Sequence, residues 1–106
     1  MVNRGEVWLA DLDPTVGSET QKTRPFVIVS PPEMHGRLRT VLAAPMTTGG
    51  GSAASRVPAK FQGKNGLILI DQIRTLDKRR LIKMLGTLTP STLQATLETL
   101  RATFAE

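Results

Sequence analysis

The sequence contains no cysteine and only one histidine, His35. The absence of cysteine excludes disulfide bonds and thiol chemistry, and a lone histidine leaves no cluster from which to build a zinc or iron site. We therefore expect neither a metal nor any other cofactor. No apolar run approaches the roughly 20 residues that a membrane-spanning helix needs, and residues 1–6 show no apolar stretch of a signal peptide. These absences predict a cytoplasmic protein without a membrane partner.

What the sequence does have is an excess of positive charge in its second half. Residues 1–53 carry five Lys or Arg and five Asp or Glu, whereas residues 54–106 carry nine against four and supply the whole net charge of +5. Most of the surplus lies between Arg56 and Lys83. A basic face attracts polyanions, either nucleic acid or an acidic protein. Because many basic proteins bind no nucleic acid, charge alone leaves the function open.

The hydrophobic pattern predicts short strands joined by tight turns within one domain, residues 1–106. The predicted strands cover residues 6–12, 25–30, 40–46, 56–61, 66–73 and 82–88. Between them, the pattern predicts a turn or one short helical turn at 33–39, a flexible loop at 49–55 and a charged turn at 77–80. Trp8 and Phe26 lie in predicted strands, so we expect both in the core.

The hydrophobic period becomes helical near the C-terminus. The apolar stripe consists of Leu93, Leu97, Leu100 and Phe104. This spacing predicts a helix over about residues 90–104, with Thr89 as N-cap and Pro90 at the first helical position. Leu88 and Leu93 stand at the two positions of a hydrophobic staple. Several short strands followed by a helix predict a mostly β fold, a small barrel covered by a helix.

Four blocks of the sequence resemble the toxins of the MazF/PemK family. They are RGEVW (4–8) with DLDPTVGSE (11–19), KTRP (22–25) with VIVSP (27–31), APMTT (44–48) and DQIRTLD (71–77). The blocks follow the family's order and spacing and span nearly the whole chain. The resemblance implies an SH3-like barrel of the CcdB/PemK type and a homodimer. It also implies a type II toxin that cuts single-stranded RNA such as mRNA, with a cognate acidic antitoxin as partner.

Metal-free RNA cleavage uses the ribose 2′-OH as the nucleophile and leaves a 2′,3′-cyclic phosphate and a 5′-OH end. The site must stabilise charge on the phosphoryl oxygens and move protons at both reacting oxygens. The planar fork of an arginine can hold two phosphate oxygens, and a threonine hydroxyl can donate one more hydrogen bond. The resemblance places Arg24 and Thr47 at the family's catalytic positions, and it makes Glu19 a candidate base or RNA contact.

Further candidates for RNA contact are polar or charged residues in or near these blocks. They are Lys22, Thr48, Asp71, Gln72, Arg74, Lys78 and Arg79. For Asp71 the interpretation stays open among orienting the site, contacting a base and forming a turn. For the cluster at residues 78–83 it stays open between a solvated turn and a phosphate-contacting rim. We expect His35, in a Pro-rich connection, to lie in a surface loop.

The sequence departs from one branch of the family at two positions. Some PemK-like members have a histidine where this chain has Ser18, and an arginine where it has Leu69. A His/Arg/Asp set for proton transfer is therefore absent, and the identity of the general base stays open. The pair Arg24 and Thr47 fits the MazF-like branch better.

Two other functions share this fold. A gyrase poison related to CcdB acts through a C-terminal end with tryptophan and glycine, whereas the only tryptophan here is Trp8. A non-catalytic SH3-like module would bind RNA or peptide without forming a product. The presence of both Arg24 and Thr47 in their blocks argues against such a module.

Overall fold

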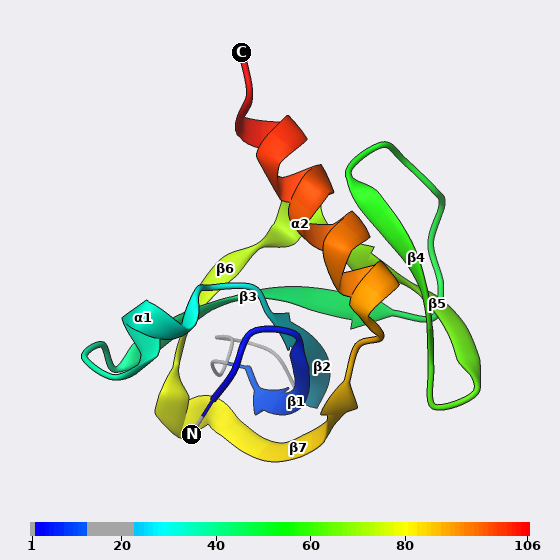
Figure 1. Cartoon of the computed structure of the whole chain (residues 1–106). Coiled ribbons are helices and arrows are strands. Elements are labelled where there is room, and N and C mark those ends of the chain that lie inside the picture. The colour runs from blue at the N-terminus through cyan, green and yellow to red at the C-terminus, as the bar shows by residue number, and fades with distance from the viewer. Residues whose placement is uncertain (1, 13–22) are drawn as a thin grey trace, which may run out of the picture.

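Seven strands form one curled antiparallel sheet that a C-terminal helix covers, in a computed structural model that describes residues 2–12 and 23–106 (Figure 1). The strands are β1 (Glu6–Asp11), β2 (Thr23–Ile28), β3 (Thr40–Thr47), β4 (Arg56–Phe61), β5 (Lys64–Leu69), β6 (Arg74–Asp77) and β7 (Leu81–Thr87). The helices are α1 (Pro32–His35) and α2 (Pro90–Phe104), and two 3₁₀ turns are η1 (Ile70–Gln72) and η2 (Lys78–Arg80). This architecture confirms the predicted mostly β fold with a terminal helix.

Strand β3 has two different partners along one of its edges. The strand order is β4-β5-β3-β2-β1-β7, and β6 also pairs with β3. Residues Thr40 to Ala43 pair with β6, whereas Met46 and Thr47 pair with β5. The sheet therefore divides at β3: Figure 1 shows β1, β2, β3, β6 and β7 around a ring, with the β4–β5 hairpin turning away at one side.

The two faces of the curled sheet are buried in two cores. Phe26 and Ile28 of β2 point into the core inside the ring, and Val27 and Val29 point into the core beneath α2 and the hairpin. Neighbouring strand residues face opposite sides, so burial of both faces explains why the segment from Phe26 to Val29 is apolar throughout. The prediction for Phe26 is confirmed at 1% exposure, whereas Trp8 is only half-buried.

Helix α2 begins where the capping residues predict. Thr89 is the N-cap, and its hydroxyl accepts a hydrogen bond from the backbone N–H of Thr92 at 3.3 Å. Pro90 follows at the first helical position, where its missing N–H costs nothing. Leu88 and Leu93 pack in the same core, as a hydrophobic staple requires. Neither helix of the described chain is long and apolar enough to cross a bilayer.

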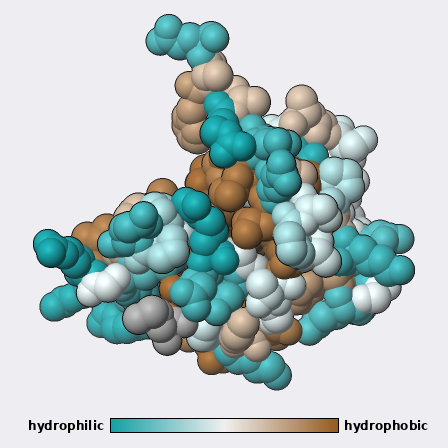
Figure 2. Space-filling view, viewed as in Figure 1, coloured by the Kyte–Doolittle hydropathy of each residue, from teal (hydrophilic) through white to brown (hydrophobic). Residues whose placement is uncertain are grey.

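The predicted apolar stripe of α2 is wrong at its far end. Thr96 is fully buried, with its hydroxyl donating to the Thr92 carbonyl at 2.8 Å, whereas Phe104 is 73% exposed. The physical reason is length, because the last turns of α2 extend beyond the sheet (Figure 1). Figure 2 shows apolar side chains gathered below α2, with hydrophilic groups on both sides of them.

The predicted strand over residues 66–73 is also wrong, because three elements share this segment. Strand β5 ends at Leu69, η1 follows, and β6 begins at Arg74 as a strand that the pattern did not predict. Ile70 is 1% exposed although it lies in η1. The apolar run therefore continues through the turn, and periodicity alone does not reveal that the chain changes partner there.

His35 is buried at 5% exposure, so the predicted surface-loop position is wrong. Its Nδ1 lies 2.7 Å from the carbonyl oxygen of Val2, and its Nε2 lies 2.7 Å from the hydroxyl of Ser30. A carbonyl can only accept, so Nδ1–H donates to Val2 and Nε2 accepts from Ser30. Ser30 Oγ also accepts from the Leu42 N–H at 3.1 Å. His35 thus fastens α1 and the N-terminal segment to β3.

Candidate active site

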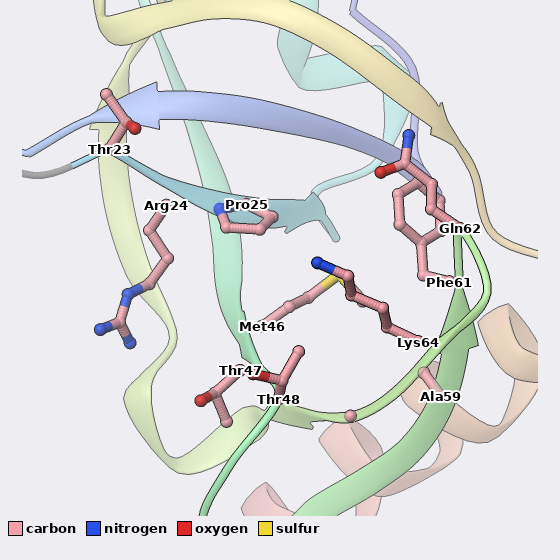
Figure 3. A pocket seen from close by; sticks show the side chains of 11 residues that line it. Thr23, Arg24, Pro25, Met46, Thr47, Thr48, Ala59, Phe61, Gln62 and Lys64 are labelled. Carbon is pink, nitrogen blue, oxygen red and sulfur yellow. The ribbon is translucent and has the colours of Figure 1, made fainter.

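A pocket of about 330 Å³ opens where the start of β2 and the end of β3 meet the β4–β5 hairpin (Figure 3). Its lining consists of Thr23, Arg24 and Pro25 from β2, Met46, Thr47 and Thr48 from the end of β3, and Ala59, Phe61, Gln62, Lys64 and Gly66 from the hairpin. Three sequence-predicted residues, Arg24, Thr47 and Thr48, therefore lie together. The hairpin side of the pocket was not predicted.

Arg24 and Thr47 line the same pocket from two neighbouring strands. The β2–β3 ladder ends with Phe26 opposite Pro45, and Arg24 and Thr47 each lie two residues beyond this pair on their own strand. Side chains alternate along a strand, so residues two apart start from the same face. Both side chains are half-buried, and Figure 3 shows them on the same side of the pocket. Rigid strands thus bring a guanidinium and a hydroxyl to one place.

Thr47 is fixed from two directions. Its hydroxyl oxygen accepts a hydrogen bond from the Gly49 N–H at 3.2 Å, which leaves the hydroxyl hydrogen available to donate. On the other side, β5 approaches so closely that a Cβ at Gly66 would lie 2.3 Å from the Thr47 carbonyl oxygen. Only glycine fits at residue 66 without moving the backbone.

The hairpin supplies the opposite wall of the pocket. Lys64 extends its amino group into the pocket above Met46 (Figure 3). Lys64 and Arg24 give the pocket two cationic groups. Three threonines, Thr23, Thr47 and Thr48, add hydroxyl groups to its lining. Guanidinium, ammonium and hydroxyl groups are the donors that bind phosphate oxygens. This set suits a phosphodiester anion.

Asp71 does not line the pocket but anchors the neighbouring loop. Its Oδ1 accepts from Ser55 Oγ at 3.3 Å and from Arg56 Nε at 3.4 Å, and Arg56 also donates to the Gly51 carbonyl at 3.1 Å. The hydrogen bond from Arg56 lowers the pKa of Asp71, so its carboxylate stays ionised. These contacts tie Asp71 to the loop at residues 49–55, and its role in the site stays a prediction.

The basic cluster of η2 lies close to Arg24 in the sheet. Ala10 of β1 pairs with Arg24 on one side and with Leu81 on the other. Leu81 is therefore two strand spacings, roughly 10 Å, from Arg24. Lys78 donates to the carbonyl of His35 and so serves the packing of α1.

Arg79 forms a forked pair with Asp77, with Nε–Oδ1 and Nη2–Oδ2 distances of 3.1 and 3.0 Å. The side chain of Arg79 is 88% exposed. These hydrogen bonds lower the pKa of Asp77 to about 2. An exposed pair contributes little to stability, and Arg79 does not line the pocket.

The other predicted residues lie apart from the pocket or beyond the described chain. Gln72 in η1 and Arg74 in β6 are exposed, and neither lines the pocket. Glu19 and Lys22 lie outside the described residues. The unpredicted wall, Phe61 to Lys64, contains a Gln-Gly turn, which is a weaker hairpin signal than Asn-Gly or Asp-Gly.

Comparison with known families agrees with this geometry. A family described as "PemK-like, MazF-like toxin of type II toxin-antitoxin system" matches residues 3–104. The chain belongs to this family. The match covers both β2 and β3, so the resemblance seen in the four sequence blocks is confirmed.

Two curated relatives of this toxin have endoribonuclease names. The endoribonuclease MazF of Staphylococcus epidermidis is 38% identical over 99 residues, which cover 86% of this chain and 81% of that protein. The endoribonuclease PemK of Escherichia coli is 37% identical over 83 residues, 74% of this chain and 62% of PemK. The chain thus spans just under two thirds of PemK.

Solved structures share the fold of this toxin. An endoribonuclease in complex with its cognate antitoxin from Mycobacterial species superimposes with a TM-score of 0.82 at 27% identity, over 96% of this chain and 93% of that chain. A MazE–MazF complex from Deinococcus radiodurans gives a TM-score of 0.83 at 24% identity, over 96% and 94%. The latter supports the fold alone.

Proposed function

We propose that this toxin is a metal-independent endoribonuclease that cuts single-stranded RNA, such as mRNA, at a short sequence. The observation that carries the proposal is that Arg24 and Thr47 line one pocket. The endoribonuclease relatives support the same activity. Family membership favours it over a gyrase poison or a non-catalytic binding module.

In the proposed reaction, the ribose 2′-oxygen attacks the adjacent phosphorus and the bond from phosphorus to the 5′-oxygen breaks. A base takes the 2′-OH proton, the leaving 5′-oxygen gains one, and the products are a 2′,3′-cyclic phosphate and a 5′-OH end. Arg24 holds the phosphoryl oxygens and offsets the charge that develops on them, and the Thr47 hydroxyl donates to one of them. Glu19 stays the sequence-based candidate for the base.

The proposed partners are an antitoxin and a second copy of the chain. The family description includes an antitoxin, and one neighbouring structure was solved with its own. We propose that an acidic, partly apolar segment of the antitoxin covers the basic surface around η2 in the cytoplasm. The second copy forms a homodimer that binds RNA between its subunits, which is what the resemblance to the family implies.

The test is cleavage of a long single-stranded RNA by purified protein in EDTA, with the cut sites and end groups mapped. We expect cuts at one short motif that leave cyclic phosphate and 5′-OH ends. Arg24→Ala should abolish cutting without changing thermal unfolding or oligomeric state, whereas the control Arg37→Ala, an exposed arginine beside α1, should cut normally. Normal cutting by Arg24→Ala would refute the site.

A matched pair at Thr47 tests the hydroxyl itself. Thr47→Val removes the donor and keeps the shape, so cleavage should fall by about 10- to 100-fold. Thr47→Ser keeps the donor and should retain most of the activity. If the wild type cuts none of a diverse set of RNAs, gel-shift and supercoiling assays distinguish the binding module from the gyrase poison.

A further inference from the structure

The tip of the β4–β5 hairpin is a two-residue turn that contains a strained glutamine. Gln62 and Gly63 have φ angles of 53° and 79°, as a type I′ turn requires. Among the described residues, Gln62 is the only one other than glycine with positive φ. Asn, Asp and Gly adopt this conformation at lower cost. Turn formation alone therefore does not explain a glutamine here, and backbone strain is found preferentially at functional sites.

Two contacts hold this tip against β7. Gln62 Nε2 donates to the carbonyl of Leu85 at 3.2 Å. The ring of Phe61 lies against Gly86, where a Cβ would come within 3.0 Å of it. The first contact uses a donor of the Gln62 carboxamide, so Oε1 remains an acceptor. Figure 3 shows this oxygen turned toward the space between Pro25 and Lys64.

The rest of the pocket suits a flat ring. Pro25 and Met46 lie between the two walls in Figure 3, and Phe61 closes the hairpin side. Apolar and aromatic side chains are the surfaces on which unpaired bases lie in RNA-binding proteins. A volume of about 330 Å³ is at the lower end of the roughly 300–1,000 Å³ typical of small-ligand pockets. The pocket therefore offers room for one nucleotide.

We propose that Gln62 is a specificity-determining residue that contacts the base next to the cut phosphate. The base lies against Pro25 and Met46 and donates an N–H to Gln62 Oε1, while the ammonium group of Lys64 attracts the backbone phosphate. Arg24 and Thr47 on the other wall hold the phosphate of that nucleotide. This inference rests on the proposed RNA cleavage and adds to it one base-reading side chain.

The experiment is cleavage of a random-sequence RNA library by the wild type, Gln62→Gly, Gln62→Asn and the control Lys60→Ala. Lys60 alternates with the pocket residues Ala59 and Phe61, so its side chain starts from the opposite face of β4. Glycine and asparagine adopt a positive φ angle at lower cost than glutamine, so both variants have less backbone strain in the turn. Their melting temperatures should therefore equal or exceed that of the wild type. The asparagine side chain is one methylene shorter and does not reach both Leu85 and the pocket.

At one RNA position beside the cut, the ratio of the cleavage rates for the preferred base and for the other bases should fall about tenfold in both Gln62 variants. The preference at the other RNA positions should not change. The Lys60→Ala control should keep the wild-type preference. A second measurement uses an RNA whose base at that position lacks the N–H. The wild type should cut it about tenfold more slowly, and Gln62→Gly should cut it no more slowly than normal RNA.

Two results overturn the inference in distinguishable ways. If the wild type cuts RNA and Gln62→Gly shows the same preference at every position, Gln62 only closes the turn and this inference fails alone. If the folded wild type cuts no RNA, the proposed function fails and this inference fails with it.

Discussion

Gly66→Ala should damage both the fold and the active site through a single contact. The added Cβ would lie 2.3 Å from the carbonyl oxygen of Thr47 and 3.2 Å from its carbonyl carbon. The first distance is about 1 Å shorter than the roughly 3.3 Å of a close C–H···O contact. Both groups belong to the backbone, so no side-chain rotation relieves the clash. The end of β3 and the start of β5 must separate by about 1 Å.

The size of each effect follows from that displacement. Overpacking of a closely packed site costs about 1–3 kcal/mol in the free energy of unfolding. For a chain of this size, about 4–8 °C are lost per kcal/mol, so the melting temperature should fall by about 4–24 °C. Thr47, which we propose as a catalytic residue, moves with the backbone, and a 1 Å shift of such a group lowers the rate by about a hundredfold. Cleavage at 25 °C should therefore fall although the chain stays folded.

Gly51→Ala is the matched control, because a Cβ there meets no atom within 4 Å. It should change the free energy of unfolding by no more than about 0.5 kcal/mol and leave cleavage unchanged. The assays are thermal unfolding followed by circular dichroism, and initial rates on one RNA substrate well below both melting temperatures. Equal melting temperatures and equal rates for the two variants would refute the argument.

Three further predictions concern separate parts of the molecule. Ser30→Ala leaves two buried hydrogen-bonding groups without partners and should cost about 2 kcal/mol or more in urea unfolding; a change below 0.5 kcal/mol would contradict this. Lys64→Ala should weaken RNA binding and reduce the slope of log affinity against log salt by about 1, whereas Lys60→Ala should change neither. Arg79→Ala should raise the pKa of Asp77 from about 2 toward 3.8 in an NMR titration. Since the pKa is lowered in the folded state, the small stabilisation by Asp77 is present above the unfolded value and lost as the pH falls toward 2; an Asp77 pKa that stays near 2 in the variant would argue against the pair.

Local chemistry explains what the sequence predicted correctly about the fold. The start of α2 depends on Thr89 and Pro90, which act within one helical turn, so both were readable from the pattern. The division between β5, η1 and β6 depends on which strand lies beside each residue. Ile70 is buried in the core although it lies in a turn. The hydrophobic pattern of the sequence therefore continues through the turn and does not reveal it. His35 was misplaced because Val2 and Leu42, its distant neighbours in the network, decide its burial.

The sequence predicted one wall of the site, the side formed by β2 and β3, but not the wall formed by the hairpin. Arg24 and Thr47 stand in recognisable blocks, so the resemblance predicts them, although only the folded structure shows that they line one pocket. Gln62 and Lys64 stand in no such block. Their importance appears only when the hairpin tip is seen to cross to Leu85 of β7. Contacts of this kind are tertiary and leave no local signal in composition or spacing.

The residues proposed to react and the residue proposed to read the base lie on different elements, which has a consequence for the evolution of such toxins. The groups proposed to react stand on β2 and β3, which are held by both cores, whereas the wall proposed to read the base is an exposed turn of four residues, Phe61 to Lys64. Surface turns tolerate substitution and insertion far better than core strands do. A lineage can therefore change which RNA sequence it destroys through a few substitutions in this tip, while its chemistry stays intact.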